Sequence, residues 1–129
     1  MTSCSSCNHD VVVERNRDRT ISVTLQVNEE AFDITGCKIW FSVKADLDDL
    51  DADAIIYKRN AAAGGDASQA QVTDGPGGIL AIYIQPEDTV DVEAGDYWWD
   101  VVIETTTPRK LQAVSPSKFS VRQPVTMAE

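Results

Sequence analysis

The chain has 129 residues, 43% of them hydrophobic and 25% charged, and its 21 acids against 11 bases give a net charge of −10. A chain of this length fits one domain with its own core. The acidic excess argues against binding to nucleic acid or to an anionic membrane. The apolar runs are too short to span a bilayer, and the start MTSCSSCNHD lacks the features of a secretory signal. We therefore expect folding in the cytoplasm, with reduced cysteines.

Alternation of apolar and polar side chains with a period of two predicts β-strands along most of the chain. A short strand at 11–13 and a half-buried strand at 20–27 come first. A turn at 33–36 leads to a strand at 37–44. The acidic connector 46–53 carries the one segment with any helical character, a single turn. Further strands are expected at 55–58, 79–84, 96–105, 111–114 and 118–122.

Two longer connections separate these strands. Residues 60–78 are rich in Gly, Ala and small polar residues, which predicts a long mobile excursion with at most a marginal strand at 69–73. Residues 85–95 form an acidic crossover. Seven or eight short strands joined by turns indicate an all-β fold, and we favour an antiparallel β-sandwich over a barrel. The sandwich is expected at 11–126, after a Cys-containing arm at 1–10.

A zinc site is the first candidate for chemistry. Cys4, Cys7 and His9 form C-x-x-C-x-H, and Cys37 would complete a set of four ligands. Only one half-site is present, however, and Cys37 also fits as an inward residue at a strand start. An inert tail and a disulfide between Cys4 and Cys7 are the alternatives, so no cofactor is expected beyond this zinc.

Two other kinds of site are weaker. Asp49, Asp51 and Asp53 form a D-x-D-x-D array like that of calcium loops, but the glycine and the bidentate Glu of such loops are missing. A turn whose aspartates cap backbone amides explains them equally well. The single histidine, His9, provides no His-based triad, so we expect no catalytic residues and no enzyme.

The aromatic residues indicate a contact surface. If Ile39 and Trp99 face the core, alternation places Trp40 and Trp98 on outer faces, where Val102 and Tyr83 would extend an apolar patch. Such patches are typical of protein interfaces. Covering by the 60–78 segment or by the N-terminal arm is the competing interpretation, and stacking on sugars, as in glycan-binding modules, is another.

The succession ITGCKIWFSVK, GGILAIYIQPEDT, EAGDYWWDVVI and KFSVRQPVT resembles small phage structural proteins with an immunoglobulin-like sandwich, such as the N-terminal domain of baseplate upper proteins. The resemblance covers about 12–126, and Tyr97 after Gly95 is similar to the tyrosine of such folds. The Cys-rich head lies outside the pattern, and no fibre extension follows the sandwich. The resemblance implies a non-enzymatic virion protein made in the host cytoplasm, a tail, baseplate, neck or capsid-decoration component. Its expected partners are other virion proteins or copies of itself, in a homo- or hetero-oligomeric assembly.

Overall fold

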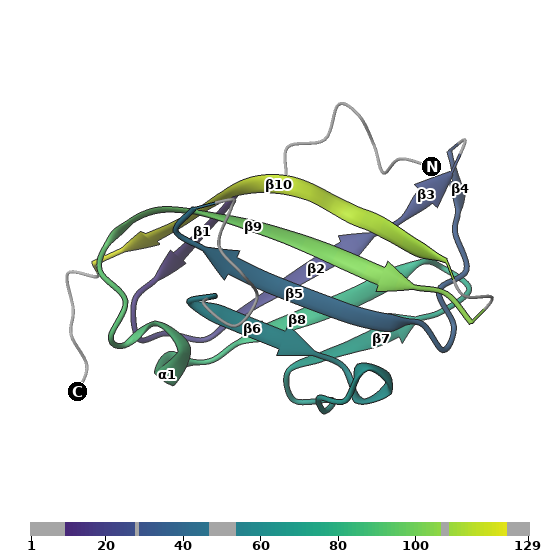
Figure 1. The fold of residues 1–129 in the computed structure, drawn as a ribbon, viewed down its shortest axis with the longest axis horizontal. Helices are drawn as coiled ribbons and strands as arrows, with labels where there is room; N and C mark the ends of the chain where they lie inside the picture. Colours follow the sequence, from purple (N-terminus) through teal and green to yellow (C-terminus); the bar gives the residue numbers. More distant parts are fainter. Residues whose placement is uncertain (1–9, 28, 47–53, 107–108, 124–129) are drawn as a thin grey trace.

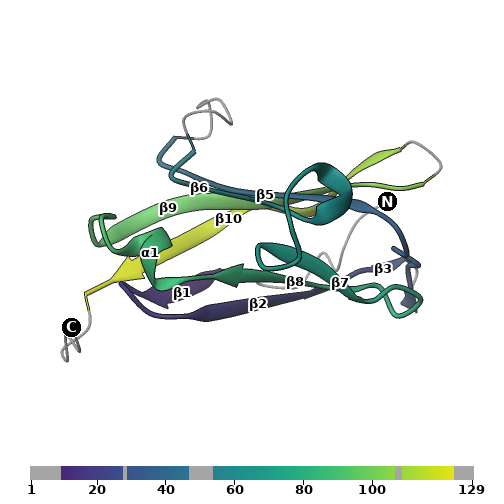
Figure 2. The same ribbon diagram turned by 90° about the horizontal axis from the view of Figure 1, so that it is seen from below.

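The computed structural model describes residues 10–27, 29–46, 54–106 and 109–123, which form two packed β-sheets (Figures 1 and 2). The larger sheet has five strands in the order β1-β10-β9-β5-β6, and the smaller has three in the order β2-β8-β7. A short hairpin of β3 and β4 follows β2. The strands are β1 (Val11–Glu14), β2 (Arg19–Thr24), β3 (Gln26–Val27), β4 (Glu30–Ala31), β5 (Lys38–Lys44), β6 (Ile56–Arg59), β7 (Ala70–Asp74), β8 (Ile79–Ile84), β9 (Gly95–Glu104) and β10 (Lys110–Arg122). No helix in these ranges is long and apolar enough to cross a membrane.

The core lies between the two sheets and follows the predicted alternation. On β9, Trp99, Val101 and Ile103 are buried, whereas their neighbours on the strand are more exposed. The ring of Phe41 packs against Trp99 with centroids 5.7 Å apart and against Phe119 at 6.4 Å. Such tilted aromatic pairs add to the free energy gained by burial. The two-residue period therefore determines which side chains of each strand form the core between the sheets.

The strand pairing differs from the predicted pattern in two places. β1 pairs with β10 in parallel, not antiparallel, through Val11↔Phe119 and Val13↔Val121. The two strands expected at 111–114 and 118–122 form one strand, β10, whose register with β9 shifts between Val114 and Ser117. Pro116 lies in this irregular part, where its missing N–H is tolerated because the ladder is already interrupted.

A short helix, α1 (Pro86–Thr89), lies in the acidic crossover 85–95, where the sequence predicted no helix. Pro86 is at its first turn, and the backbone N–H of Gln85 donates to Asp88 Oδ2 at 2.7 Å. Four residues are too few for a 3.6-residue period, so hydrophobic periodicity gave no sign of this helix.

The 60–78 segment folds back onto the sandwich. The marginal strand expected at 69–73 is confirmed as β7, displaced by one residue, and its register gives Ala70↔Ile82. A 3₁₀ turn (Ala61–Ala63) precedes it. The segment closes against the chain after β2, since the N–H of Ile34 donates to Gly75 O at 2.9 Å. Most of the expected excursion is therefore a part of the fold.

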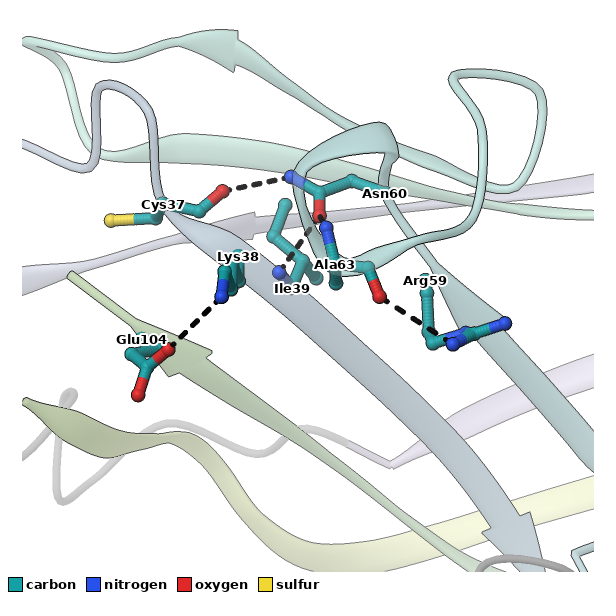
Figure 3. A network of polar contacts seen from close by, with 7 residues as sticks. All are labelled: Cys37, Lys38, Ile39, Arg59, Asn60, Ala63 and Glu104. Carbon is teal, nitrogen blue, oxygen red and sulfur yellow. Dashed lines mark hydrogen bonds and ion pairs between the residues drawn. The ribbon is translucent and has the colours of Figure 1, made fainter. Parts of the chain in front are cut away.

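Asn60 joins this segment to the larger sheet (Figure 3). Its Oδ1 accepts from Ile39 N at 3.0 Å and from Ala63 N at 3.1 Å, and its Nδ2 donates to Cys37 O at 2.8 Å. Asn60 is buried, so these bonds satisfy backbone groups that water does not reach. One side chain thus connects the end of β6 to the beginning of β5.

Candidate functional site

The outer face of the five-stranded sheet carries large apolar side chains. Alternation along β5 and β9 turns Trp40, Trp98 and Val102 away from the core, and the register pairs Trp40 with Val102. Tyr57 of the edge strand β6 is on the same face, opposite Ser42. Trp98 is 40% exposed and Tyr57 37% exposed. We call this surface, the outward side of β1, β10, β9, β5 and β6, the outer face.

Asp100 lies in the middle of the outer face. Its carboxylate accepts from Ser42 Oγ at 3.3 Å and from Gln112 Nε2 at 2.7 Å. Gln112 also donates to Val114 O at 2.8 Å, at the point where β10 changes register. Both donors to Asp100 are neutral side chains, so no described hydrogen-bond donor to this carboxylate is a base.

Two adjoining hollows flank this polar centre. One, of about 160 Å³, is lined by Ser42, Lys44, Trp98, Trp99, Asp100 and Pro116. The other, of about 300 Å³, is lined by Trp40, Ser42, Lys44, Tyr57, Asp100, Val102 and Lys110. Both hollows thus combine aromatic with polar and charged lining residues, and both are open to solvent. Such a surface can accept protruding side chains, but its size does not enclose a drug-sized ligand.

The outer face is also where the bases of this acidic chain gather. Lys38 pairs with Glu104 at 3.6 Å and Lys118 with Asp96 at 3.9 Å, both near the surface. Lys110 Nζ lies 5.8 Å from the ring centroid of Trp40. The outward strand positions hold six bases and four acids: Lys38, Lys44, Arg59, Lys110, Lys118 and Arg122, with Glu14, Asp96, Asp100 and Glu104. These described strand positions therefore have two more bases than acids, although the chain as a whole has a net charge of −10.

The expected patch is only partly assembled. Trp40, Trp98 and Val102 share the outer face, but Tyr83 does not lie beside them. It is on β8 of the smaller sheet, opposite Thr20, and its hydroxyl contacts Gln71 Nε2 at 2.6 Å. The expectation for Tyr83 was wrong because alternation predicts whether a side chain points inward or outward, but it does not predict which of the two sheets the strand joins.

The competing interpretation, that the 60–78 segment or the N-terminal arm covers the tryptophans, can be tested in part. No residue of the described part of 60–78 lines either hollow. That segment therefore does not cover Trp98, and the N-terminal arm 1–9 lies outside the described residues. Sequence reasoning did not name Tyr57, Asp100 and Gln112 as members of the face. Alternation along β9 already places Asp100 on the side of Trp98, whereas Tyr57 and Gln112 can be added only once the strand order is known.

The predicted metal ligands are not brought together by what the structure describes. Cys37 is buried, and burial followed by the charge of Asp33 raises the pKa of its thiol. Cys4, Cys7 and His9, like the calcium candidates Asp49, Asp51 and Asp53, lie outside the described residues. Among those that are described, no three His, Cys, Asp or Glu side chains form a metal-binding group. Zinc and calcium binding stay predictions.

The strand order defines the class of fold. β2-β8-β7 on one sheet and β10-β9-β5-β6 on the other correspond to the strands of a variable-type immunoglobulin sandwich, with β9 as the penultimate strand. Tyr97 near the start of β9 donates its hydroxyl to Glu93 O at 2.7 Å, as the tyrosine corner of such folds does. Phe41 and Trp99 occupy the centre, where antibody domains have a disulfide and a tryptophan. The chain is thus an all-β sandwich of the immunoglobulin-like class.

Comparisons with solved structures find proteins of the same class at low similarity. The chain aligns with a ZIG-8–RIG-5 IG1–IG1 heterodimer at TM-score 0.41 and 11% identity, covering 92% of this chain and 85% of that one. Murine CRIg aligns at TM-score 0.40 and 16% identity, over 88% and 92%. The first Ig-like domain of human CD48 aligns at TM-score 0.32 and 14% identity, over 100% and 95%. No family model and no curated protein matches the chain.

Proposed function

We propose that the chain is a protein-interaction domain that binds through its outer face, and that it serves as a non-enzymatic structural component of a phage particle. One observation carries the first part. Among the described residues, four large hydrophobic side chains are exposed, and three of them (Val12, Tyr57 and Trp98) lie on the outer face. Exposed aromatic groups beside hollows are typical of the centres of protein interfaces.

The phage assignment has a different basis. It is supported by the resemblance of the strand-by-strand sequence pattern to baseplate and related virion proteins. A one-domain sandwich fits a tail, baseplate, neck or decoration component equally well, because the fold alone does not select a role. The proposed location is the assembled particle, after synthesis in the host cytoplasm.

Mass spectrometry of purified particles tests the location. A virion component is present at a stoichiometry that persists through washing and gradient purification. Its absence from particles made by a host that expresses the chain contradicts the phage role.

Variants of the outer face test the interaction. Trp98→Ser together with Tyr57→Ser removes two exposed rings and leaves the core intact, so we expect the fold to persist. Incorporation into particles should fall by roughly tenfold or more if these rings are central to the contact. Tyr83→Ser is the matched control, because Tyr83 lies on the outside of the other sheet. Equal incorporation of both proteins contradicts the use of the outer face.

A glycan is the second candidate ligand, favoured by the hollows themselves. Their aromatic walls, together with the carboxylate of Asp100 and the amide of Gln112, provide the stacking surfaces and hydrogen-bonding groups that sugars use. Binding of a sugar over Trp98 should change tryptophan fluorescence, and Trp98→Ser should abolish that change. No change across a broad panel of oligosaccharides removes this candidate.

A further inference from the structure

We propose that the outer face of one copy binds the acidic turn around α1 of a second copy, so that copies associate head to tail. This inference rests on the proposed function, because it names the partner of the same surface. The face and the turn are complementary both in charge and in exposed apolar groups.

The charge distribution favours an acidic occupant. Ten acids and bases stand at outward positions of the larger sheet, and the bases are in excess there although the chain as a whole has a net charge of −10. Lys44 and Asp100 line both hollows, and Lys110 lines the larger one, which therefore has two bases and one acid. An acidic side chain placed over the larger hollow meets two lysines and two aromatic rings, and such complementarity selects partners and orientation.

The turn around α1 has the matching chemistry. Glu87, Asp91 and Glu93 are exposed there, and no base occurs in the sequence between Arg59 and Arg109. Val90, in the middle of these acids, is 39% exposed and is the fourth of the exposed large hydrophobic side chains. It is the one member of that group outside the outer face.

The turn is held in a fixed shape. Lys58 Nζ contacts Asp88 Oδ2 at 2.6 Å, and Asp88 also accepts from Gln85 N, so this one acid points inward. The turn 15–18 contacts α1 through a bond from Asn16 N to Thr89 Oγ1 at 2.8 Å. Arg15 and Arg17 against Asp18 give the turn 15–18 a net charge of +1, smaller than the −3 of the exposed Glu87, Asp91 and Glu93. A preorganised turn loses little conformational entropy when it binds.

The charges also favour head-to-tail over face-to-face association. Two outer faces brought together would oppose surfaces with the same excess of bases. The turn lies at one end of the sandwich, away from the β3–β4 hairpin at the other end (Figures 1 and 2). A contact between two different surfaces repeats from copy to copy, and it gives a ring or an open filament according to the rotation it imposes.

Sedimentation velocity of the full chain over a range of concentrations tests this arrangement with charge reversals on each surface. Lys44→Glu with Lys110→Glu reverses the face, and Glu87→Lys with Asp91→Lys reverses the turn while keeping Asp88. Each double variant alone should associate at least about tenfold more weakly than the wild type. An equimolar mixture of the two should recover association, because each then offers the surface that the other needs. Glu29→Lys with Glu30→Lys at the distant hairpin is the control matched in charge to the turn variant. It should associate more strongly than the face variant and more strongly than the turn variant.

The outcomes separate this inference from the proposed function. A wild-type chain that stays monomeric at all concentrations in about 0.02 M salt overturns head-to-tail association, while the particle experiments still decide the role of the outer face. Loss of association in the face variant alone, with a turn variant that behaves as wild type, also overturns it and indicates a face-to-face dimer. Recovery in the mixture supports it, as does weakening in about 0.5 M salt, where the Debye length falls to a few ångströms.

Discussion

Asn60 shows how much of this fold depends on one polar side chain. It satisfies the buried N–H of Ile39 and the carbonyl of Cys37, which otherwise have no access to water (Figure 3). Asn60→Ala leaves both unpaired, and we expect a loss of about 2–4 kcal/mol in the free energy of unfolding. Urea denaturation measures it, with the exposed Gln26→Ala as a control that should change little. An unfolding midpoint equal to that of the wild type would contradict this role.

Cys37 should be an inert thiol in the folded protein. Burial, and to a lesser extent the charge of Asp33, raises its pKa, so the nucleophilic thiolate is rare. In a Cys4→Ser, Cys7→Ser background, we expect a thiol reagent at pH 8 to label Cys37 only as fast as the protein unfolds. Rapid labelling under native conditions would show that the site is open.

The same pKa shift has a defined sign in stability. Because the folded pKa lies above the unfolded one, the stabilisation is complete below the ordinary thiol pKa and is lost as the pH rises through the folded value. The stability of the Cys37 protein should therefore fall relative to a Cys37→Ala variant above about pH 9. Parallel pH profiles of the two proteins would rule this out.

Between elements, the ion pair of Lys58 and Asp88 joins the edge strand β6 to α1. The two side chains are 6% and 18% exposed and their charged atoms are 2.6 Å apart. Lys58→Met leaves the carboxylate of Asp88 without its cation, and we expect a loss of about 2–4 kcal/mol. Asp88→Asn keeps an acceptor for Gln85 N, so the double variant should lose less than the sum of the single losses. Purely additive losses in a double-mutant cycle would mean that the pair is not coupled.

The same elements show what sequence reasoning could and could not predict. β5 and β9 were predicted within a residue or two because an apolar side chain occurs at every second position over most of each strand, from Ile39 to Val43 and from Tyr97 to Ile103. α1 escaped detection because it is shorter than two turns. The outward side of Trp98 follows from its strand alone, but its neighbours Tyr57 and Gln112 depend on strand order, which is a long-range property. Tyr83 was misplaced for the same reason.

For the whole molecule, the charge distribution predicts opposite effects of salt on folding and on association. Folding concentrates a net charge of −10 in a compact body, so the charges repel one another more than in the unfolded chain. Screening by salt should therefore raise the free energy of unfolding between about 0.02 M and 0.3 M. The contact between the positive outer face and the acidic turn is attractive, so the same screening should weaken it. Urea denaturation at low protein concentration and sedimentation at high concentration measure the two effects separately. If both respond to salt in the same direction, screening of the repulsion between two copies of net charge −10 outweighs screening of the contact between face and turn. An apolar contact such as Trp98 against Val90 would then have to drive the association.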